Sequence, residues 1–446
     1  MSDKLFGTDG VRGKANVFPM TVDFVLKLGM ALGKTLKSGA KVAIAKDTRI
    51  SGDMLEASLT AGLTSMGIDV LLLGVMPTPA AAMLTSKLGV QTTIVISASH
   101  NPYFDNGIKL IKSDGHKYSD EMTAALENLI AQNHFDFDAE TIGKVERRED
   151  ALNIYLDKLF QLKKTDAPLK GLRVVLDCAH GAFSSFAPHV LKSFGAEVFE
   201  IGVQPNGYNI NKDCGSTATA LMSQTVLENK ADIGIALDGD GDRIIVCDEK
   251  GQRIDGDQLI AFLSDYLNQN GRLKGNAVVA TIWSNLGLEK FVASKGMSFY
   301  RTAVGERYVT EKMIEIGANF GGEESGHMVL SDFTPTGDGL LTGILLCLGI
   351  LSLKKKMSDI FPVFEKCPCL IQNFRFNDRE KVDQVMKNAD VCRVIEEAKQ
   401  KMLASGSVIV RKSGTEPLIK VRVESENALL VEEVSQMIKS EISKFV

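Results

Sequence analysis

The stretch Thr93-Ile-Val-Ile-Ser-Ala-Ser-His-Asn-Pro-Tyr-Phe-Asp-Asn-Gly-Ile-Lys109 decides the fold. It opens with consecutive apolar and β-branched residues, a pattern typical of a strand buried on both faces of a parallel sheet. Asn101-Pro102 ends this regular structure. Ligands of open α/β sheets bind beyond the carboxyl ends of the strands, so Ser99 and His100 are candidate functional residues, with Lys109 close behind. For an isolated Ser-His pair, a polar turn is the alternative.

Length and composition limit the classes of protein to consider. A chain of 446 residues is too long for one core and predicts three or four domains. Its 44% hydrophobic and 24% charged residues are those of an ordinary globular protein. A net charge of −5 argues against nucleic acid as a partner.

Cysteine usage and hydropathy predict the compartment. The seven cysteines are odd in number and scattered, as reduced thiols are, and the N-terminus has no apolar signal segment. The longest apolar run, Gly343–Leu353, is shorter than the about 18 residues of a membrane span and predicts a buried helix. We therefore expect a soluble, cytoplasmic protein without a membrane partner.

The first predicted domain, residues 1–155, alternates strands and helices around the Ser99 stretch. Near its start, Leu5–Gly13 interleaves glycines with Thr, Asp and Arg, so the backbone can approach a ligand and Arg12 can bind a phosphate. Lys46-Asp-Thr-Arg49 lies between a predicted strand and a helix N-terminus. It predicts either an anion site or a solvated loop.

The second predicted domain, residues 156–255, contains Asp238-Gly-Asp-Gly-Asp-Arg243 at the end of a buried strand. Three carboxylates at alternate positions can converge on one hard cation, and ligands that are all oxygen favour Mg²⁺. An EF-hand is excluded because Arg243 stands where its sixth residue must be Gly, and because strands flank the loop. The loop Pro205–Thr217 is dense in turn-forming residues and long enough to be functional.

Two further polar loops follow. In the third predicted domain, residues 256–368, Gly322-Glu-Glu-Ser-Gly-His327 offers groups that hydrogen-bond a polyhydroxylated ligand, and His327 can move protons near neutral pH. A hairpin turn is the alternative. In the smaller fourth α+β domain, residues 369–446, Arg411-Lys-Ser-Gly-Thr-Glu-Pro417 lies between two strands and has the cations and hydroxyls of a phosphate site. There the alternative is a charged hairpin.

Taken together in this order, the loops resemble the α-D-phosphohexomutase superfamily over the whole chain. The four matching signatures are Ser97–Pro102, Asp238–Arg243, Gly322–His327 and Arg411–Pro417. Phe6–Gly13 and Asn209–Thr217 resemble the branch that acts on glucosamine phosphates. The resemblance implies three doubly wound α/β domains and a C-terminal α+β domain around a central cleft, with hinge motion before Leu370.

The resemblance also implies an activity and its residues. The expected enzyme is an isomerase that interconverts glucosamine 6-phosphate and glucosamine 1-phosphate, through a phosphoserine at Ser99 and a glucosamine 1,6-bisphosphate intermediate. One Mg²⁺ per active site would be held by Asp238, Asp240, Asp242 and a phosphoryl oxygen on Ser99. The residues implied around the transferring group are Arg12, His100 and Lys109, and Lys109 or His327 is implied as the catalytic acid or base. The residues implied in substrate binding are Arg243, Glu323, Ser325, Arg411, Ser413, Gly414 and Thr415.

Other functions stay open at this point. Four positions depart from the superfamily pattern, namely Lys46, His180, Ala218 and Glu324. A phosphoglucomutase or phosphomannomutase with the same mechanism is therefore the nearest alternative. A phosphatase and a non-catalytic sugar-phosphate sensor on the same scaffold are more distant ones. An acidic four-domain enzyme of this kind can also form a homodimer.

Overall fold

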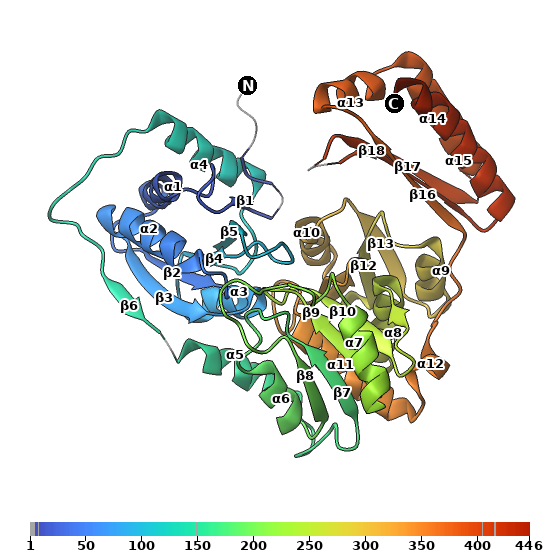
Figure 1. The fold of residues 1–446 in the computed structure, drawn as a ribbon, viewed down its shortest axis with the longest axis horizontal. Helices are drawn as coiled ribbons and strands as arrows, with labels where there is room; N and C mark the ends of the chain where they lie inside the picture. Colours follow the sequence, from blue (N-terminus) through green and yellow to red (C-terminus); the bar gives the residue numbers. More distant parts are fainter. Residues whose placement is uncertain (1–4, 8, 149, 404, 414–415) are drawn as a thin grey trace. The chain divides into compact units, whose positions relative to one another are not determined.

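A computed structural model describes residues 5–7, 9–148, 150–403, 405–413 and 416–446 (Figure 1). It contains four β-sheets, three in α/β domains and a smaller one near the C-terminus, which confirms the predicted fold class. By their contacts the residues form two compact units. Unit 1 is Met1–Trp283 with Met297–Val363, and unit 2 is Ser284–Gly296 with Phe364–Val446.

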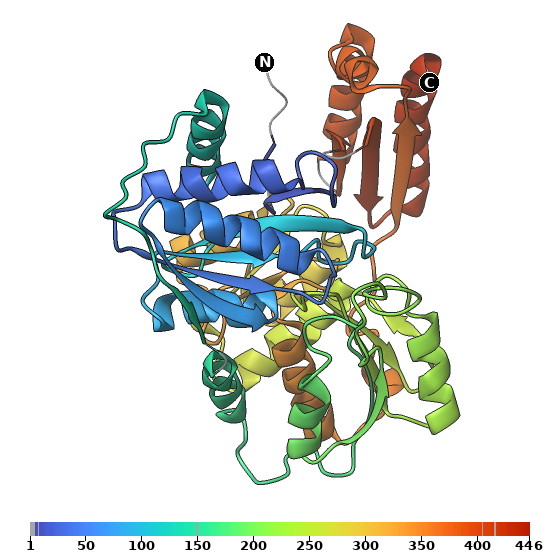
Figure 2. The same cartoon turned by 60° about the vertical axis from the view of Figure 1, so that its left-hand side comes forward.

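The first sheet of unit 1 carries the Ser99 loop. Its strands, in spatial order, are β1 (Val11–Lys14), β5 (Asp105–Lys112), β4 (Thr92–Ile96), β2 (Lys41–Lys46), β3 (Asp69–Val75) and β6 (Val145–Arg147). Its helices are α1 (Val22–Thr35), α2 (Gly52–Ser65), α3 (Thr78–Lys87) and α4 (Asp120–Gln132). Helices α1 and α2 lie on one face and α3 on the other (Figure 2), so β4 is buried on both faces as expected. The sheet is mixed rather than all parallel, because β4 runs parallel to β2 but antiparallel to β5.

The second sheet carries the acidic loop. Its strands, in spatial order, are β11 (Arg253–Ile254), β10 (Ile244–Asp248), β9 (Ile233–Leu237), β7 (Arg173–Asp177) and β8 (Glu197–Ile201). The helices of this part of the chain are α5 (Ala151–Phe160), α6 (Ala187–Ser193) and α7 (Ala220–Asn229). Strands β9 and β10 are buried and antiparallel, so the Asp238–Arg243 loop is a short connection held firmly at both ends.

The third sheet completes unit 1. Its strands, in spatial order, are β13 (Ser298–Thr302), β12 (Ala277–Thr281), β14 (Phe320–Gly322) and β15 (Met328–Leu330). The helices are α8 (Gly256–Gln269), η1 (Lys274–Asn276), α10 (Glu306–Ile316), α11 (Gly339–Leu353) and α12 (Met357–Ile360). The predicted apolar helix is α11, which packs against β9, β10 and α8. Among the described residues, no helix combines the length and the hydropathy needed to cross a membrane.

Unit 2 has one antiparallel sheet, in the order β16 (Cys369–Arg375), β18 (Leu418–Ser425) and β17 (Gly406–Lys412). Its helices are α9 (Leu286–Ser294), α13 (Arg379–Met386), α14 (Ala389–Met402), α15 (Ala428–Ile442) and η2 (Ser443–Phe445). Helices α14 and α15 pack side by side against the sheet and close its core (Figure 1). The Glu424 carboxylate accepts hydrogen bonds from Arg422 (3.1 Å) and from the Leu286 backbone (2.9 Å), which ties the start of α9 to this unit.

Candidate active site

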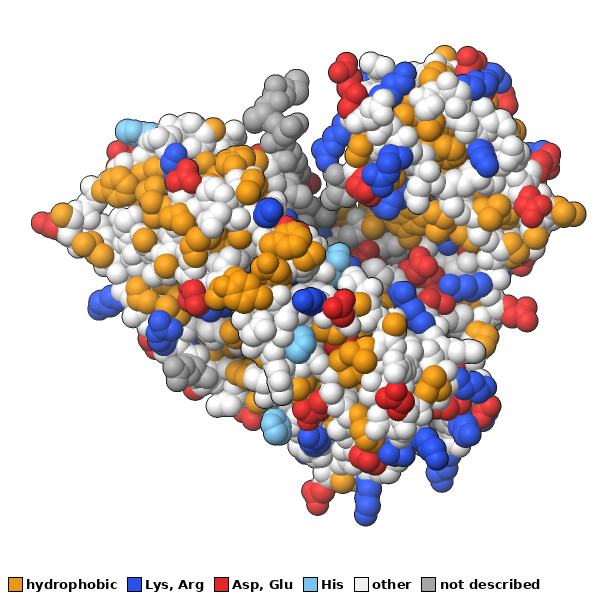
Figure 3. Space-filling view, viewed as in Figure 1, with side chains coloured by type: hydrophobic (Ala, Val, Ile, Leu, Met, Phe, Trp, Pro, Cys, Tyr) orange, Lys and Arg blue, Asp and Glu red, His pale blue; other side chains and the backbone are white. Residues whose placement is uncertain are grey.

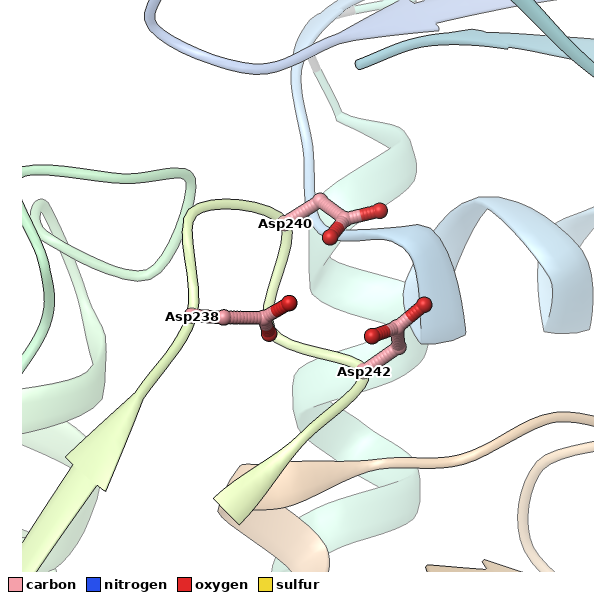
Figure 4. A group of neighbouring side chains, drawn as sticks. All are labelled: Asp238, Asp240 and Asp242. Carbon is pink, nitrogen blue, oxygen red and sulfur yellow. The ribbon is translucent and has the colours of Figure 1, made fainter. Parts of the chain in front are cut away.

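The three carboxylates of the acidic loop gather on one side of the connection between β9 and β10 (Figure 4). Asp238, Asp240 and Asp242 are all buried, and one carboxylate oxygen from each lies within 4.8 Å of the others. Alternate residues of this loop are glycines, which let it turn so tightly that the three side chains converge. The predicted convergence is therefore present.

The chemistry of these residues fits a hard cation. Asp240 Oδ1 and Asp242 Oδ1 are buried and have no hydrogen-bond partner among the residues that the structure describes. Buried carboxylate oxygens without a partner are costly, and a divalent metal with oxygen ligands would satisfy them. Burial and the neighbouring charges of Asp242 and Asp240 raise the pKa of Asp238 to about 8. At neutral pH this crowding is relieved by a proton on Asp238, and a divalent cation that displaces the proton would engage all three carboxylates.

Ser99 lies directly beside the acidic loop. Its Oγ donates a hydrogen bond to Asp238 Oδ2 (2.5 Å) and lies 3.3 Å from His100 Nδ1. The Ser99 backbone has a left-handed conformation with φ of 54°, which is unusual for a residue other than glycine. The loop after β4 thus turns the serine hydroxyl toward the carboxylates of the second sheet.

Two predicted cations lie on neighbouring strands of the first sheet. Lys109 of β5 is buried, and its Nζ is 2.6 Å from Asp240 Oδ2 and 3.1 Å from Asp242 Oδ2. Arg12 of β1 pairs with Asp9 and reaches the Ala98 carbonyl at 3.4 Å. Burial lowers the pKa of Lys109, but the carboxylates of Asp240 and Asp242 outweigh it and raise that pKa well above its ordinary value. Lys109 is therefore a fixed positive charge at neutral pH.

The two predicted histidines differ in their protonation. Burial, together with the charges of Arg243 and Arg12, lowers the pKa of His100 to about 4, so its imidazole is neutral. Burial also lowers the pKa of His327, but Glu306, whose Oε2 is 3.0 Å from Nε2, opposes this effect. With a further contribution from Asp242, the pKa of His327 is raised to about 9.

The glycine-rich turn of the third domain lies next to the acidic loop. It connects β14 and β15, and Ile244 of β10 donates a backbone hydrogen bond to the Gly326 carbonyl (3.0 Å). On this turn Glu323 is half-buried and Ser325 is exposed. Arg243 is partly exposed, with Nε 3.8 Å from Asp242 Oδ1. Burial lowers its pKa, but the carboxylates of Asp242 and Asp238, with smaller contributions from Asp9 and Glu323, raise it above its ordinary value. Unit 1 therefore brings the predicted sugar-binding turn to the acidic loop.

The predicted phosphate-binding loop belongs to unit 2. Arg411 lies near the end of β17, and the Ser413 amide donates to the Leu418 carbonyl at 2.9 Å. The Glu416 amide donates to Ser413 Oγ at 3.3 Å. The loop thus connects β17 and β18, as the sequence predicted. Gly414 and Thr415 lie outside the described residues.

Several polar residues at the site were not singled out from the sequence. Thr78 Oγ1 donates to Asp240 Oδ2, and Lys117 pairs with both Asp9 and Glu306, the latter at 2.5 Å. Asp9 stands in the glycine-rich stretch that drew attention to Arg12. The sequence around Thr78, Lys117 and Glu306 did not mark them as functional, because each interacts with a partner more than a hundred positions away in the chain.

Neither of the two alternatives for Lys46–Arg49, an anion site or a solvated loop, describes the side chains of Lys46 and Arg49. Lys46 Nζ pairs with Asp53 (2.6 Å) and Glu56 (2.5 Å), both of the following helix α2. Arg49 is buried and pairs with Asp47 at 2.9 Å. Because protein oxygens already engage both cations, neither is available to a ligand anion.

Comparison with known proteins assigns the chain to a class. Models of the phosphoglucomutase/phosphomannomutase alpha/beta/alpha domains I, II and III match residues 3–137, 153–251 and 255–367. The model of the C-terminal domain matches residues 372–441. The chain therefore belongs to the phosphoglucomutase/phosphomannomutase family.

Within that class, the curated proteins to which it is similar include phosphoglucosamine mutases. That of Rhodospirillum centenum is 47% identical over 97% of this chain and 94% of the relative. That of Parvibaculum lavamentivorans is 47% identical over 97% of each chain. The crystal structure of a phosphoglucomutase/phosphomannomutase family protein from Burkholderia thailandensis shares the fold. Its TM-score is 0.82 at 24% identity, covering 100% of this chain and 98% of that one.

Proposed function

We propose that the protein is a phosphoglucosamine mutase, which interconverts glucosamine 6-phosphate and glucosamine 1-phosphate and so supplies amino-sugar nucleotide synthesis. The observation that carries the proposal is the Ser99 hydroxyl, 2.5 Å from a buried acidic triad and flanked by Lys109 and Arg12. The relatives named above support the choice of amino sugar, since they are curated as phosphoglucosamine mutases and match nearly the whole chain.

The proposed reaction has two phosphoryl transfers. The bond between Ser99 Oγ and phosphorus breaks as a sugar hydroxyl oxygen bonds to the phosphorus, and the hydroxyl proton passes to a base. This gives glucosamine 1,6-bisphosphate, which turns over in the site. Its other phosphoryl group then moves back to Ser99, whose oxygen takes the place of the sugar oxygen as that oxygen recovers a proton. Atoms and charge balance over the cycle.

The residues of unit 1 would position and neutralise the transferring group, which is most of what phosphoryl transfer requires. Mg²⁺ bound by Asp238, Asp240, Asp242 and a phosphoryl oxygen would supply electrostatic stabilisation of the transferring phosphoryl group. Lys109 and Arg12 add positive charge, and His100 lies against the Ser99 hydroxyl. Lys109 and His327, both protonated at neutral pH in the metal-free protein, are the two candidates for the acid that returns a proton to the sugar oxygen, and either would act as the base once it has lost its proton.

The remaining predicted residues would hold the sugar and the non-reacting phosphate. Glu323 and Ser325 present a carboxylate and a hydroxyl on one short turn, a pair suited to sugar hydroxyls. We assign Arg243 to substrate binding as well, because it is partly exposed beside this turn. Arg411 and Ser413 would bind the non-reacting phosphate, together with Gly414 and Thr415.

The test is turnover with Mg²⁺ and a trace of the hexose 1,6-bisphosphate. Glucosamine 6-phosphate is compared with glucose 1-phosphate and mannose 1-phosphate at equal concentrations. We expect kcat/KM to be largest for the amino sugar. A preference for glucose or mannose phosphate would contradict the substrate and favour the alternative of a phosphoglucomutase or phosphomannomutase with the same residues.

The same assay separates the more distant functions. A phosphatase would release inorganic phosphate from the sugar phosphate and would form no isomer. A sensor would bind the sugar phosphate without converting it. A sensor, and a phosphatase in which the loop aspartates do the chemistry, both fit poorly with a serine hydroxyl 2.5 Å from the acidic triad, because neither needs a serine as phosphoryl acceptor.

We also propose that the protein is cytoplasmic and forms a homodimer. All seven cysteines are free, as in a reducing cytoplasm. Exposed side chains such as Phe18, Phe104 and Tyr208 contribute apolar surface to unit 1, and Figure 3 shows hydrophobic side chains over the part of unit 1 at the left. Such a surface suits a homodimer. Sedimentation as a monomer at micromolar concentration would contradict the dimer.

The four domains are proposed as residues 1–155, 156–255, 256–368 and 369–446. Each contains one of the four sheets, which supports the division. Limited proteolysis that cleaves first near residue 368, in the exposed segment before the fourth domain, is the expected result.

A further inference from the structure

The Ser99 backbone is held in a conformation that serine rarely adopts. With φ of 54° it lies in the left-handed region, where the Cβ atom crowds the following carbonyl. Such residues persist only where the surroundings hold them in place. The contacts that hold Ser99 therefore also aim its hydroxyl at Asp238.

Arg49 makes the first set of contacts that hold the Ser99 backbone, and every N–H group of its guanidinium donates a hydrogen bond. It donates five hydrogen bonds, one to the Asp47 carboxylate and four to backbone carbonyls of the Ser99 loop. The loop acceptors are the carbonyls of Ser99 (2.9 Å), Asn101 (2.8 Å), Pro102 and Asp105 (3.0 Å). Arginine has five N–H donors, so none remains for a ligand.

The Asp47 carboxylate connects these hydrogen bonds to the start of the Ser99 loop. It accepts a hydrogen bond from Ser97 Oγ (2.6 Å), which in turn accepts one from the Ser99 amide (2.9 Å). Both polar groups of the Ser99 backbone are therefore bonded into one network. Asp47 is wholly buried and balances the charge of Arg49.

Asn211 makes the second set of contacts that hold the Ser99 backbone. It lies in the part of the chain that forms the second sheet. Its Nδ2 donates to the Ser99 carbonyl (2.8 Å) and to the Asn101 carbonyl (3.0 Å). These are the same two oxygens that Arg49 holds, so each of them receives a hydrogen bond from both side chains. Asn211 lies in the long Pro205–Thr217 loop, which the sequence marked as functional without a role.

The Asn211 side chain is suited to this task. Its own backbone has φ of 57°, a conformation that asparagine tolerates better than most residues. Its Oδ1 is buried and has no hydrogen-bond partner among the described residues, so the carboxamide is oriented by its two donations. Gly239 of the acidic loop lies against it, and a Cβ there would come within 3.0 Å of Asn211 Nδ2 and 2.8 Å of the Ser99 carbonyl oxygen.

We propose that Asn211 and Arg49 are positioning residues of the phosphoryl-transfer site, and that the Pro205–Thr217 loop exists in part to carry Asn211. From two domains they clamp the Ser99 and Asn101 carbonyls and hold the left-handed backbone at Ser99. This inference rests on the proposed function, because it is the proposed phosphoserine that they position. We expect neither side chain to contact substrate, because the N–H groups of both are taken by protein oxygens.

The test uses Asn211→Gly, with Asn209→Ala as its matched control. Glycine keeps the positive φ without strain and removes the Asn211 side chain, including its carboxamide. Asn209 belongs to the same loop, but its side chain bonds within the loop, to the Gln204 carbonyl (2.9 Å) and the Asn206 amide (2.9 Å). Arg49→Lys is a second variant that keeps the charge opposite Asp47 but has at most three donors.

Two measurements are made on each variant. The first is kcat and KM for the sugar phosphate. For Asn211→Gly we expect kcat to fall by about ten- to a hundredfold, as for a displacement near 1 Å of a reacting group, with KM little changed. The second is hydrogen exchange of peptides covering residues 97–105, which we expect to quicken in Asn211→Gly and Arg49→Lys but not in Asn209→Ala.

The outcomes separate this inference from the proposed function. Wild-type protein that isomerises no hexose phosphate would overturn the proposed function. Hydrogen exchange of residues 97–105 would still show whether Asn211 and Arg49 hold the Ser99 backbone. An active wild type with unchanged kcat and unchanged exchange in Asn211→Gly would overturn the inference. A rise in KM without a fall in kcat would also overturn it, because that is the signature of a substrate contact.

Discussion

Ser99 is the residue on which the proposed chemistry depends, and its hydroxyl has one strong partner. Oγ donates to Asp238 Oδ2 at 2.5 Å, and Asp238 Oδ1 separately accepts the Arg243 amide at 3.1 Å. Removing the hydroxyl therefore takes away the phosphoryl acceptor without breaking the bond that anchors Asp238 to its own loop.

We expect Ser99→Ala to abolish isomerisation while the protein stays folded. The loss should be about 10⁴-fold or more, because no other group can carry the phosphoryl between the two transfers. Turnover and the thermal unfolding midpoint are measured on the same preparation. Full activity in the variant would rule out the phosphoserine.

The acidic triad predicts a specific effect on metal affinity. Asp240→Asn keeps the shape of the side chain and its contacts with Thr78 and Lys109 but removes one charge. The Mg²⁺ affinity should fall by at least about 10- to 100-fold, the loss typical even of outer-shell partners. Calorimetric Mg²⁺ titration is the measurement. Asp248→Asn, a buried acid on neighbouring β10, is the control and should titrate like the wild type.

From the sequence, the reactive groups of single residues were easier to predict than the residues with which they interact. The carboxylates, Ser99 and Lys109 were recognised because their chemistry shows in the residue type and spacing. For Arg49 the sequence left an anion site and a solvated loop as alternatives, because the four carbonyls that it binds are backbone atoms and leave no trace in composition. Glu306 was missed because its partners, Lys117 and His327, come from other elements.

Among the elements, helix α11 carries an unusual ionisable group at its start. Asp338 is its N-cap residue, and its side chain accepts from the Leu341 amide (3.0 Å) and lies 2.9 Å from the Tyr155 hydroxyl of α5. The carboxyl is wholly buried, and burial raises its pKa to about 7. The folded protein therefore holds a proton on Asp338 that the unfolded chain releases near pH 4.

This shift makes the stability of the fold depend on pH. Between about pH 4 and 7 the folded state binds more protons than the unfolded state, so stability falls as the pH rises through that window. Asp338→Asn keeps the N-cap but cannot ionise, so it should lack this loss, which amounts to up to about 4 kcal/mol. Thermal midpoints of metal-free protein at pH 5 and pH 8 are compared. Equal pH dependence in the wild type and the variant would contradict the shift.

Most elements were predictable from sequence, and the exceptions have physical reasons. The buried strand β4 and the apolar helix α11 follow from local hydrophobicity and occur close to where they were expected. The mixed pairing of β4 could not be read in the same way, because a strand buried on both faces has the same composition beside a parallel or an antiparallel neighbour. That choice depends on the path of the chain through Asn101-Pro102.

At the scale of the whole molecule, the chain divides into two compact units. Unit 2 includes α9 as well as the C-terminal residues, because buried Arg422 and Glu424 bond the backbone at Ser284 and Leu286. The proposed catalytic groups lie in unit 1, and the predicted phosphate loop lies in unit 2. A bisphosphate that turns over between two transfers would need such a loop to release and rebind it.

We therefore expect the orientation of unit 2 relative to unit 1 to change on substrate binding, with a hinge in the segment before Leu370. Crystal structures of the free and the substrate-bound enzyme, superposed on unit 1, give the measurement. A shift of the C-terminal sheet together with α13, α14 and α15, all of which follow the hinge, is the expected result. Indistinguishable positions in the two states would contradict the hinge.

The most direct test of the central claim is the mass of the peptide that contains Ser99. The protein is incubated with hexose 1,6-bisphosphate and Mg²⁺, digested, and compared with Ser99→Ala treated in the same way. The account predicts one phosphoryl group on Ser99 that is lost on addition of glucosamine 6-phosphate as isomerisation proceeds. Isomerisation in which Ser99 never carries phosphate would contradict it.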